Sequence, residues 1–85
     1  MNKTEIRSNV ISALEKIYVF IDESEDEDVN LESYIEDSIQ FMSFIVELEE
    51  IFNVEIPAEL LIFDNFKMLN DTCAILEELL KANAA

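Results

Sequence analysis

The 85-residue sequence has no glycine, no histidine and no tryptophan, and it contains a single proline, Pro57, and a single cysteine, Cys73. Because tight hairpin turns depend on glycine or Asn-Gly pairs, the absence of glycine argues against a β protein and favours helices joined by polar loops. One cysteine cannot close an intramolecular disulfide. Without histidine, no nucleophile and base pair for acyl transfer is at hand, so we expect no catalytic residues and no enzyme.

Basic side chains are also scarce, because 5 Lys and Arg stand against 20 Asp and Glu and give a net charge of −15. Such a surface repels phosphate backbones and attracts basic protein patches, which excludes nucleic acid as a partner. Apolar residues nevertheless make up 51% of the chain, enough to offset the ordering entropy. We therefore expect one folded domain over residues 1–85.

Long apolar runs are missing as well. No uninterrupted stretch approaches the roughly 18 residues that a membrane span needs. The first residues lack the basic region, apolar stretch and small-residue cleavage site of a secretory signal. These observations predict a soluble protein in the cytoplasm, and we expect it to be a monomer.

The apolar residues that are present recur at intervals of three or four, which is the spacing of amphipathic helices. Asn2 or Thr4 is placed to cap the first helix and Asp37 the second, and the second helix is expected to end before Pro57. The fold class predicted is all-α, a small four-helix bundle of three main helices and one short helix. The predicted helices cover residues 4–20, 38–53, 58–63 and 70–81.

Between the first two helices, residues 22–28 read Asp-Glu-Ser-Glu-Asp-Glu-Asp, which predicts a solvated acidic linker. The alternating carboxylates resemble calcium ligands. A calcium-binding loop that begins at Asp22 has Glu27 where glycine is needed and Ser33 where a bidentate glutamate is needed. We therefore expect no specific metal site.

The second helix has apolar residues on two faces. The broad sector predicted to face the core comprises Phe41, Phe44, Ile45, Leu48, Ile51 and Phe52. On the other side, Ile39, Met42 and Val46 lie together beside Glu49 and Glu50, close to Ser38 at the helix start. An exposed apolar patch of this kind marks an interaction site, unless a loop or another helix covers it.

Two segments of this region resemble the acyl carrier protein family. Asp37-Ser38-Ile39 resembles its Asp-Ser-Leu attachment motif. The sequence VELEEIFNVEIP, from Val46 to Pro57, resembles its Glu-Leu-Glu-Glu-x-Phe stretch and the Glu-Ile-Pro that follows. Order, spacing, length and acidity also resemble those of the family.

The resemblance implies a carrier whose Ser38 is esterified by phosphopantetheine from coenzyme A, a reaction performed by a phosphopantetheinyl transferase. Asp37 supports that site. The arm then holds an acyl or aminoacyl thioester for a fatty acid, polyketide or nonribosomal peptide pathway. Partners are loading, condensing and transferring enzymes, whose basic patches meet a docking surface formed by Ile39, Met42, Val46, Glu49 and Glu50.

Some residues depart from the family's pattern. Gln40 and Ser43 stand at positions that resemble acidic recognition sites, and the bulky Phe41 and Phe44 narrow any channel for a long acyl chain. These departures favour a specialised pathway with small acyl or aminoacyl cargo. The alternative is an unmodified acidic helical interaction module, a degenerate carrier paralogue, and modification at Ser38 separates the two.

Overall fold

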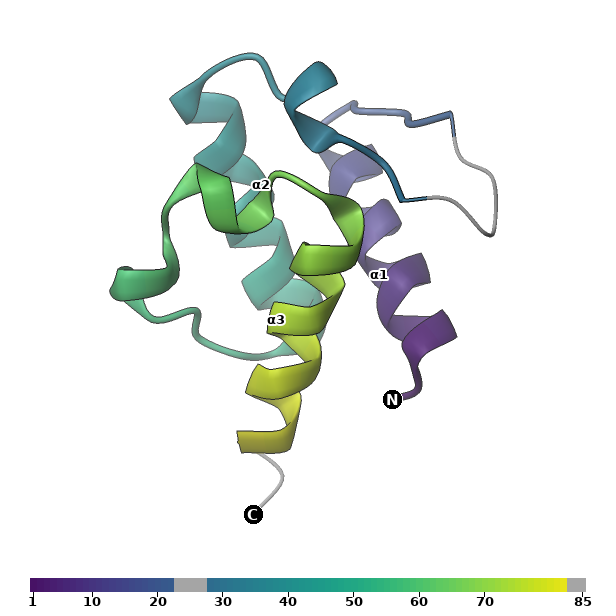
Figure 1. Cartoon of the computed structure of the whole chain (residues 1–85), viewed down its shortest axis with the longest axis vertical. Coiled ribbons are helices and arrows are strands. Elements are labelled where there is room, and N and C mark those ends of the chain that lie inside the picture. Colours follow the sequence, from purple (N-terminus) through teal and green to yellow (C-terminus); the bar gives the residue numbers. More distant parts are fainter. Residues whose placement is uncertain (23–27, 83–85) are drawn as a thin grey trace.

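A computed structural model describes residues 1–22 and 28–82 of the chain. Within them, α1 packs against both α2 and α3, and short 3-10 turns join the helices (Figure 1). The elements are α1 (Lys3–Lys16), η1 (Leu31–Ser33), α2 (Ser38–Phe52), η2 (Ala58–Leu60), η3 (Phe63–Phe66) and α3 (Leu69–Ala82). The predicted all-α fold class is confirmed for these residues, none of which lies in a named strand. None of their helices is long and apolar enough to cross a membrane.

The first helix is shorter than predicted, because it ends at Lys16 and not at residue 20. Tyr18 adopts a left-handed backbone conformation with φ of 64°, and the amide of Val19 donates to the carbonyl of Leu14 at 2.9 Å. This hydrogen bond is characteristic of the Schellman motif at a helix C-terminus. In that motif the residue with the left-handed conformation, here Tyr18, is usually glycine. Because this residue is tyrosine and not glycine, the sequence pattern did not predict that α1 ends at Lys16. At the other end, Asn2 forms the cap, as one of the two predicted alternatives.

The predicted short helix over residues 58–63 is not an α-helix. Two 3-10 turns, η2 and η3, occupy this region and are interrupted at residues 61–62. Their hydrogen bonds span three residues, as from the amide of Leu60 to the carbonyl of Pro57 at 2.9 Å. The side chain of Asn65 bridges the two turns by donating to the carbonyl of Leu60 at 3.1 Å.

The long connection before α2 is held against the segment that precedes α3. The amide of Leu31 donates to the carbonyl of Lys67 at 2.7 Å, and the amide of Leu69 donates to the carbonyl of Val29 at 2.8 Å. Val29 and Leu31 are both buried in the core. The loop is therefore attached to the core.

Asp28, the last residue of the acidic run, is exposed, as expected of a solvated linker, but its side chain also takes part in the fold. Its Oδ1 accepts hydrogen bonds from its neighbour Val29 at 2.9 Å and from the amide of Asn70 at 2.8 Å. Because Asn70 lies in the first turn of α3, Asp28 caps that helix from 42 positions away. Residues 23–27 of the run lie outside the described part of the chain.

The core forms where the inner faces of the three helices meet the loop residues. The predicted core sector of α2 is buried except for Ile51, which is half-buried. On α3, Thr72 is buried and the neighbouring Cys73 is half-buried. The Thr72 hydroxyl donates to the carbonyls of Phe66 and Met68 at 3.3 and 3.1 Å, which satisfies its hydrogen-bonding capacity inside the core.

Candidate functional site

The start of α2 is fixed by reciprocal hydrogen bonds between side chains and backbone. Asp37 has extended backbone angles, and its Oδ1 accepts a hydrogen bond from the amide of Gln40 at 2.8 Å. Gln40 in turn accepts, through Oε1, from the amide of Glu36 at 2.7 Å. The predicted cap at Asp37 is confirmed. Gln40 adds a second hydrogen bond at the start of the helix. The sequence analysis considered Gln40 only as a residue at the position of an acidic recognition site, and did not predict this structural role.

Ser38 is the first residue of α2 and is exposed. No described residue forms a hydrogen bond with its hydroxyl, so the group is not engaged in capping. The N-terminus of a helix carries a partial positive charge and unpaired amides, which favour a phosphate group there. An exposed hydroxyl at this position fits esterification by a phosphopantetheine phosphate.

Two depressions flank Ser38. The first, which we name the outer groove, is open and has a volume of about 630 Å³; it is lined by Ile17, Ser38, Ile39, Met42, Ser43, Val46 and Glu47. The second, the inner hollow, measures about 190 Å³ and is lined by Ile35, Glu36, Asp37, Ser38, Phe41 and Phe63. The serine therefore lies between an external surface and an entrance toward the core.

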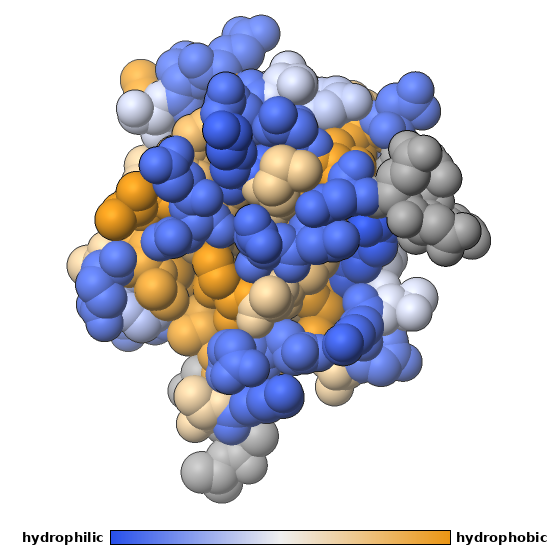
Figure 2. Space-filling model, in the orientation of Figure 1, coloured by the Kyte–Doolittle hydropathy of each residue, from blue (hydrophilic) through white to orange (hydrophobic). Residues whose placement is uncertain are grey.

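The apolar patch predicted beside Ser38 is exposed in the structure. Ile39 is 81% exposed, Val46 48% and Met42 44%, so neither the loop nor another helix covers them. Figure 2 shows one face of the molecule, where hydrophilic side chains surround smaller apolar areas. An uncovered apolar patch within such a charged surface is suited to binding a partner.

The two glutamates predicted to lie beside this patch, Glu49 and Glu50, differ in their exposure. Glu49 is only half-exposed, and its Oε2 accepts a hydrogen bond from the amide of Ile56 at 2.8 Å. Glu49 therefore anchors the segment after α2, in addition to any role in docking. Glu50 is exposed, and Glu47, which the sequence pattern did not single out, lines the outer groove.

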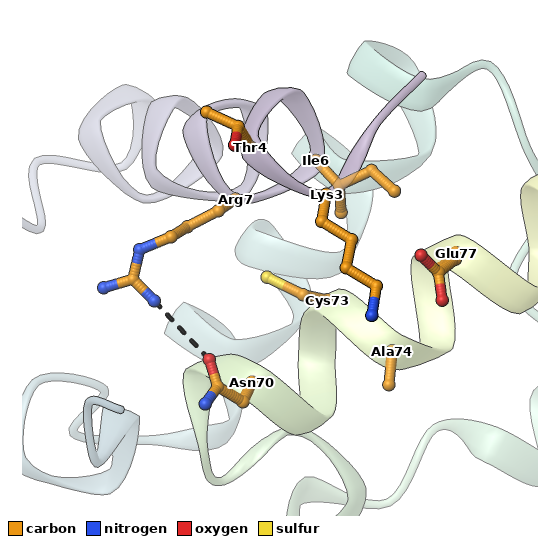
Figure 3. A pocket seen from close by; sticks show the side chains of 8 residues that line it. All are labelled: Lys3, Thr4, Ile6, Arg7, Asn70, Cys73, Ala74 and Glu77. Carbon is orange, nitrogen blue, oxygen red and sulfur yellow. Dashed lines mark hydrogen bonds between the residues drawn. The ribbon is translucent and has the colours of Figure 1, made fainter. Parts of the chain in front are cut away.

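A further pocket of about 420 Å³ lies between α1 and α3 (Figure 3). Arg7 reaches across from α1 and donates to Oδ1 of Asn70 at 3.5 Å. The sulfur of Cys73 lies in this pocket, and burial raises the pKa of that thiol to about 11. The guanidinium of Arg7 lowers the pKa and the carboxylate of Asp28 raises it, but the effect of burial is larger.

Because only the thiolate is nucleophilic, Cys73 is expected to react slowly with iodoacetamide. At pH 8 its alkylation in the folded protein should be on the order of a hundredfold slower than in urea, where the pKa returns to about 8.5. The folded rate should rise about tenfold per pH unit up to pH 10, because the thiolate fraction does so. Intact mass against time measures both rates. A folded rate that levels off below pH 9 would contradict this prediction.

Among residues 1–22 and 28–82, no group of three or more His, Cys, Asp and Glu side chains is placed to hold a metal ion. Most of the alternating carboxylates of the acidic run lie outside these residues.

Comparison with known proteins gives the family. The family model described as the phosphopantetheine attachment site matches residues 9–76, which is most of the chain. The chain belongs to this family of carrier proteins, whose domain holds a covalently bound phosphopantetheine and is not itself a catalyst. The helical fold is consistent with a small carrier protein. Searches of curated proteins and of solved structures found no match.

Proposed function

We propose that Ser38 is the attachment residue and that the protein carries acyl or aminoacyl thioesters between enzymes of a biosynthetic pathway of the fatty acid, polyketide or nonribosomal peptide type. The proposal is supported by the position of Ser38 at the start of α2. Ser38 is an exposed serine directly after a capping aspartate, its hydroxyl has no partner among the described residues, and it falls inside the matched range.

Each residue of the site has a separate task in this proposal. The Oγ of Ser38 forms a bond to the β-phosphorus of coenzyme A, the pyrophosphate bond breaks, and adenosine 3′,5′-bisphosphate leaves while the hydroxyl proton passes to the transferase or to water. Asp37 holds the first turn of α2 in place and keeps Ser38 exposed. Once bound, the group supplies a thiol that holds the cargo as a thioester, so the chain needs no nucleophile of its own.

The partners we propose are a phosphopantetheinyl transferase and the enzymes that load, condense or transfer the cargo. Ile39, Met42 and Val46 supply apolar contact, while the carboxylates of Glu49 and Glu50 meet basic residues of the partner around this contact. Charge of −15 speeds encounter with basic patches, and a small apolar contact allows rapid release. We place the protein in the cytoplasm, because a free thiol arm needs a reducing compartment.

The test is the intact mass of the purified protein after incubation with coenzyme A, Mg²⁺ and a promiscuous phosphopantetheinyl transferase. We expect a gain of one phosphopantetheine per chain. A control reaction without transferase should leave the mass unchanged. No gain with several transferases would contradict the proposal and favour the unmodified interaction module.

A further inference from the structure

Tyr18, just after the end of α1, has a backbone conformation that is unfavourable for tyrosine. Its φ of 64° lies in the left-handed region, and among the described residues only Asn53 also has a positive φ. Asparagine adopts this conformation more readily than most residues, because its short polar side chain can hydrogen-bond locally, whereas a bulky side chain crowds the backbone. Glycine would occupy position 18 without this steric cost. The fold therefore carries strain at Tyr18 that a smaller residue would remove.

The side chain of Tyr18 gives no packing in return for this strain. Tyr18 is 85% exposed, more than any other large apolar residue of the described chain. Its hydroxyl forms no hydrogen bond with a described residue, and its ring packs on no other described aromatic ring. Phe20 is also exposed, at 67%, whereas Val19 between them is buried. Backbone strain beneath a side chain without a structural contact points to a task outside the fold.

Tyr18 and Phe20 are the two exposed aromatic side chains of the described residues, and we call them the aromatic edge. The edge lies beside Ser38, because Ile17, the residue before Tyr18, lines the outer groove together with Ser38. Since consecutive Cα atoms are about 3.8 Å apart, the Cα of Phe20 lies within about 11 Å of that of Ile17. An enzyme that takes Ser38 into its active site therefore approaches the aromatic edge as well.

The charges near the aromatic edge select the kind of partner. Glu15 and Asp22 precede and follow it in the chain, and both are exposed. Glu47 lines the outer groove, and Lys16 is the one exposed cation among residues 15–22. Because each copy of the chain carries a net charge of −15, a second copy is repelled and a basic protein surface is attracted. Aromatic side chains that enter an apolar recess are frequent anchors of such interfaces.

We propose that the aromatic edge binds the phosphopantetheinyl transferase that modifies Ser38, through a basic surface with an apolar recess for the two rings. This inference rests on the proposed function of Ser38 and adds a contact outside α2. The edge binds the enzyme and takes no part in the chemistry, so it lowers the KM of the transferase for this chain and leaves kcat unchanged. The strain at Tyr18 is retained because glycine would remove the ring that binds, which is a loss of stability in favour of function.

Steady-state kinetics of the transferase reaction test this contact, with coenzyme A saturating and the concentration of the carrier varied. Of the transferases that load the wild type, the one with the lowest KM is used. Tyr18→Gly removes the ring and suits the left-handed backbone. We expect its KM to rise at least about fivefold, the loss typical of an aromatic anchor, with kcat unchanged. Phe20→Ser should raise KM in the same way.

Stability and two control variants isolate the effect of the ring. In urea denaturation, Tyr18→Gly should be at least as stable as the wild type, so that a higher KM does not come from unfolding. Asn53→Gly makes the same backbone change at the other left-handed residue, which lies at the end of α2 opposite Ser38. Tyr18→Phe retains an aromatic ring at position 18. Both controls should have the KM of the wild type.

The outcomes separate this inference from the proposed function. A wild-type chain that no transferase loads contradicts both. A loaded wild type with the same KM as Tyr18→Gly contradicts the aromatic edge while Ser38 stands as the attachment residue. A Tyr18→Gly protein less stable than the wild type would show that the ring serves the fold. A wild type that is dimeric in sedimentation equilibrium, and monomeric as Tyr18→Gly, would show that it binds a second copy, and either result overturns the inference.

Discussion

Ser38→Ala is expected to abolish uptake of phosphopantetheine completely while leaving the fold intact. Alanine removes the only atom of residue 38 that can form the phosphate ester. The first turn of α2 keeps its cap, because Asp37 and Gln40 supply the hydrogen bonds and the Ser38 hydroxyl supplies none. The free energy of unfolding should therefore change by less than about 0.5 kcal/mol. Intact mass after the transferase reaction and urea denaturation measure the two quantities.

Ser43→Ala is the matched control for this experiment. Ser43 is also exposed and lines the same groove, but it lies five residues after the start of α2 and its hydroxyl donates to the carbonyl of Ile39 at 3.0 Å. The Ser43→Ala protein should be loaded as completely as the wild type. If Ser38→Ala still gains mass, or if Ser43→Ala does not, the assignment of the attachment residue is wrong.

Leu48→Ala is expected to lower the free energy of unfolding by about 2–5 kcal/mol. Leu48 has no exposed surface and lies in the buried face of α2, so truncation removes apolar contact and leaves a cavity. A small domain is stable by only about 5–15 kcal/mol, so this loss is large for the protein. Phe52→Ala, at a residue that is 5% exposed, should have a similar effect.

Urea denaturation of the unmodified protein, followed by circular dichroism, measures this loss. The control is Ile62→Ala, at a side chain that is 57% exposed, which should change stability by less than about 0.5 kcal/mol. Equal losses at Leu48 and Ile62 would contradict the assignment of the core face of α2.

The course of α2 could be predicted from sequence because its determinants are local. Phe41, Phe44, Ile45 and Leu48 recur with the period of a helix, and Asp37 lies in the position of a cap before them. The end of α1 could not be predicted in this way, because its left-handed residue is Tyr18 and not glycine. Nor does local pattern distinguish a 3-10 turn from a short α-helix after Pro57.

In the candidate site, too, some features follow from local sequence and others depend on tertiary contacts. That Ile39, Met42 and Val46 lie together on one side of α2 follows from the helical period and was predicted, whereas the pattern left open whether a loop or another helix covers them. The outer groove also includes Ile17, the C-cap of α1, which lies there because α1 packs against α2. Likewise, the hydrogen bond between Glu49 and Ile56 depends on how the chain turns back after α2. Such tertiary contacts leave no periodic signal in the sequence.

Asp28, Val29 and Leu31 form hydrogen bonds with the segment around the start of α3, and we call this set of contacts the clamp. The clamp has a consequence for the acidic run that precedes it. The clamp fixes the point at which the chain rejoins the core, and the hydroxyl of Tyr34 accepts a hydrogen bond from the amide of Asp22 on the other side of the run. These two anchors hold the chain on both sides of the run. Charge can thus be added to or removed from this segment, to tune the attraction of basic partners, without displacing Ser38.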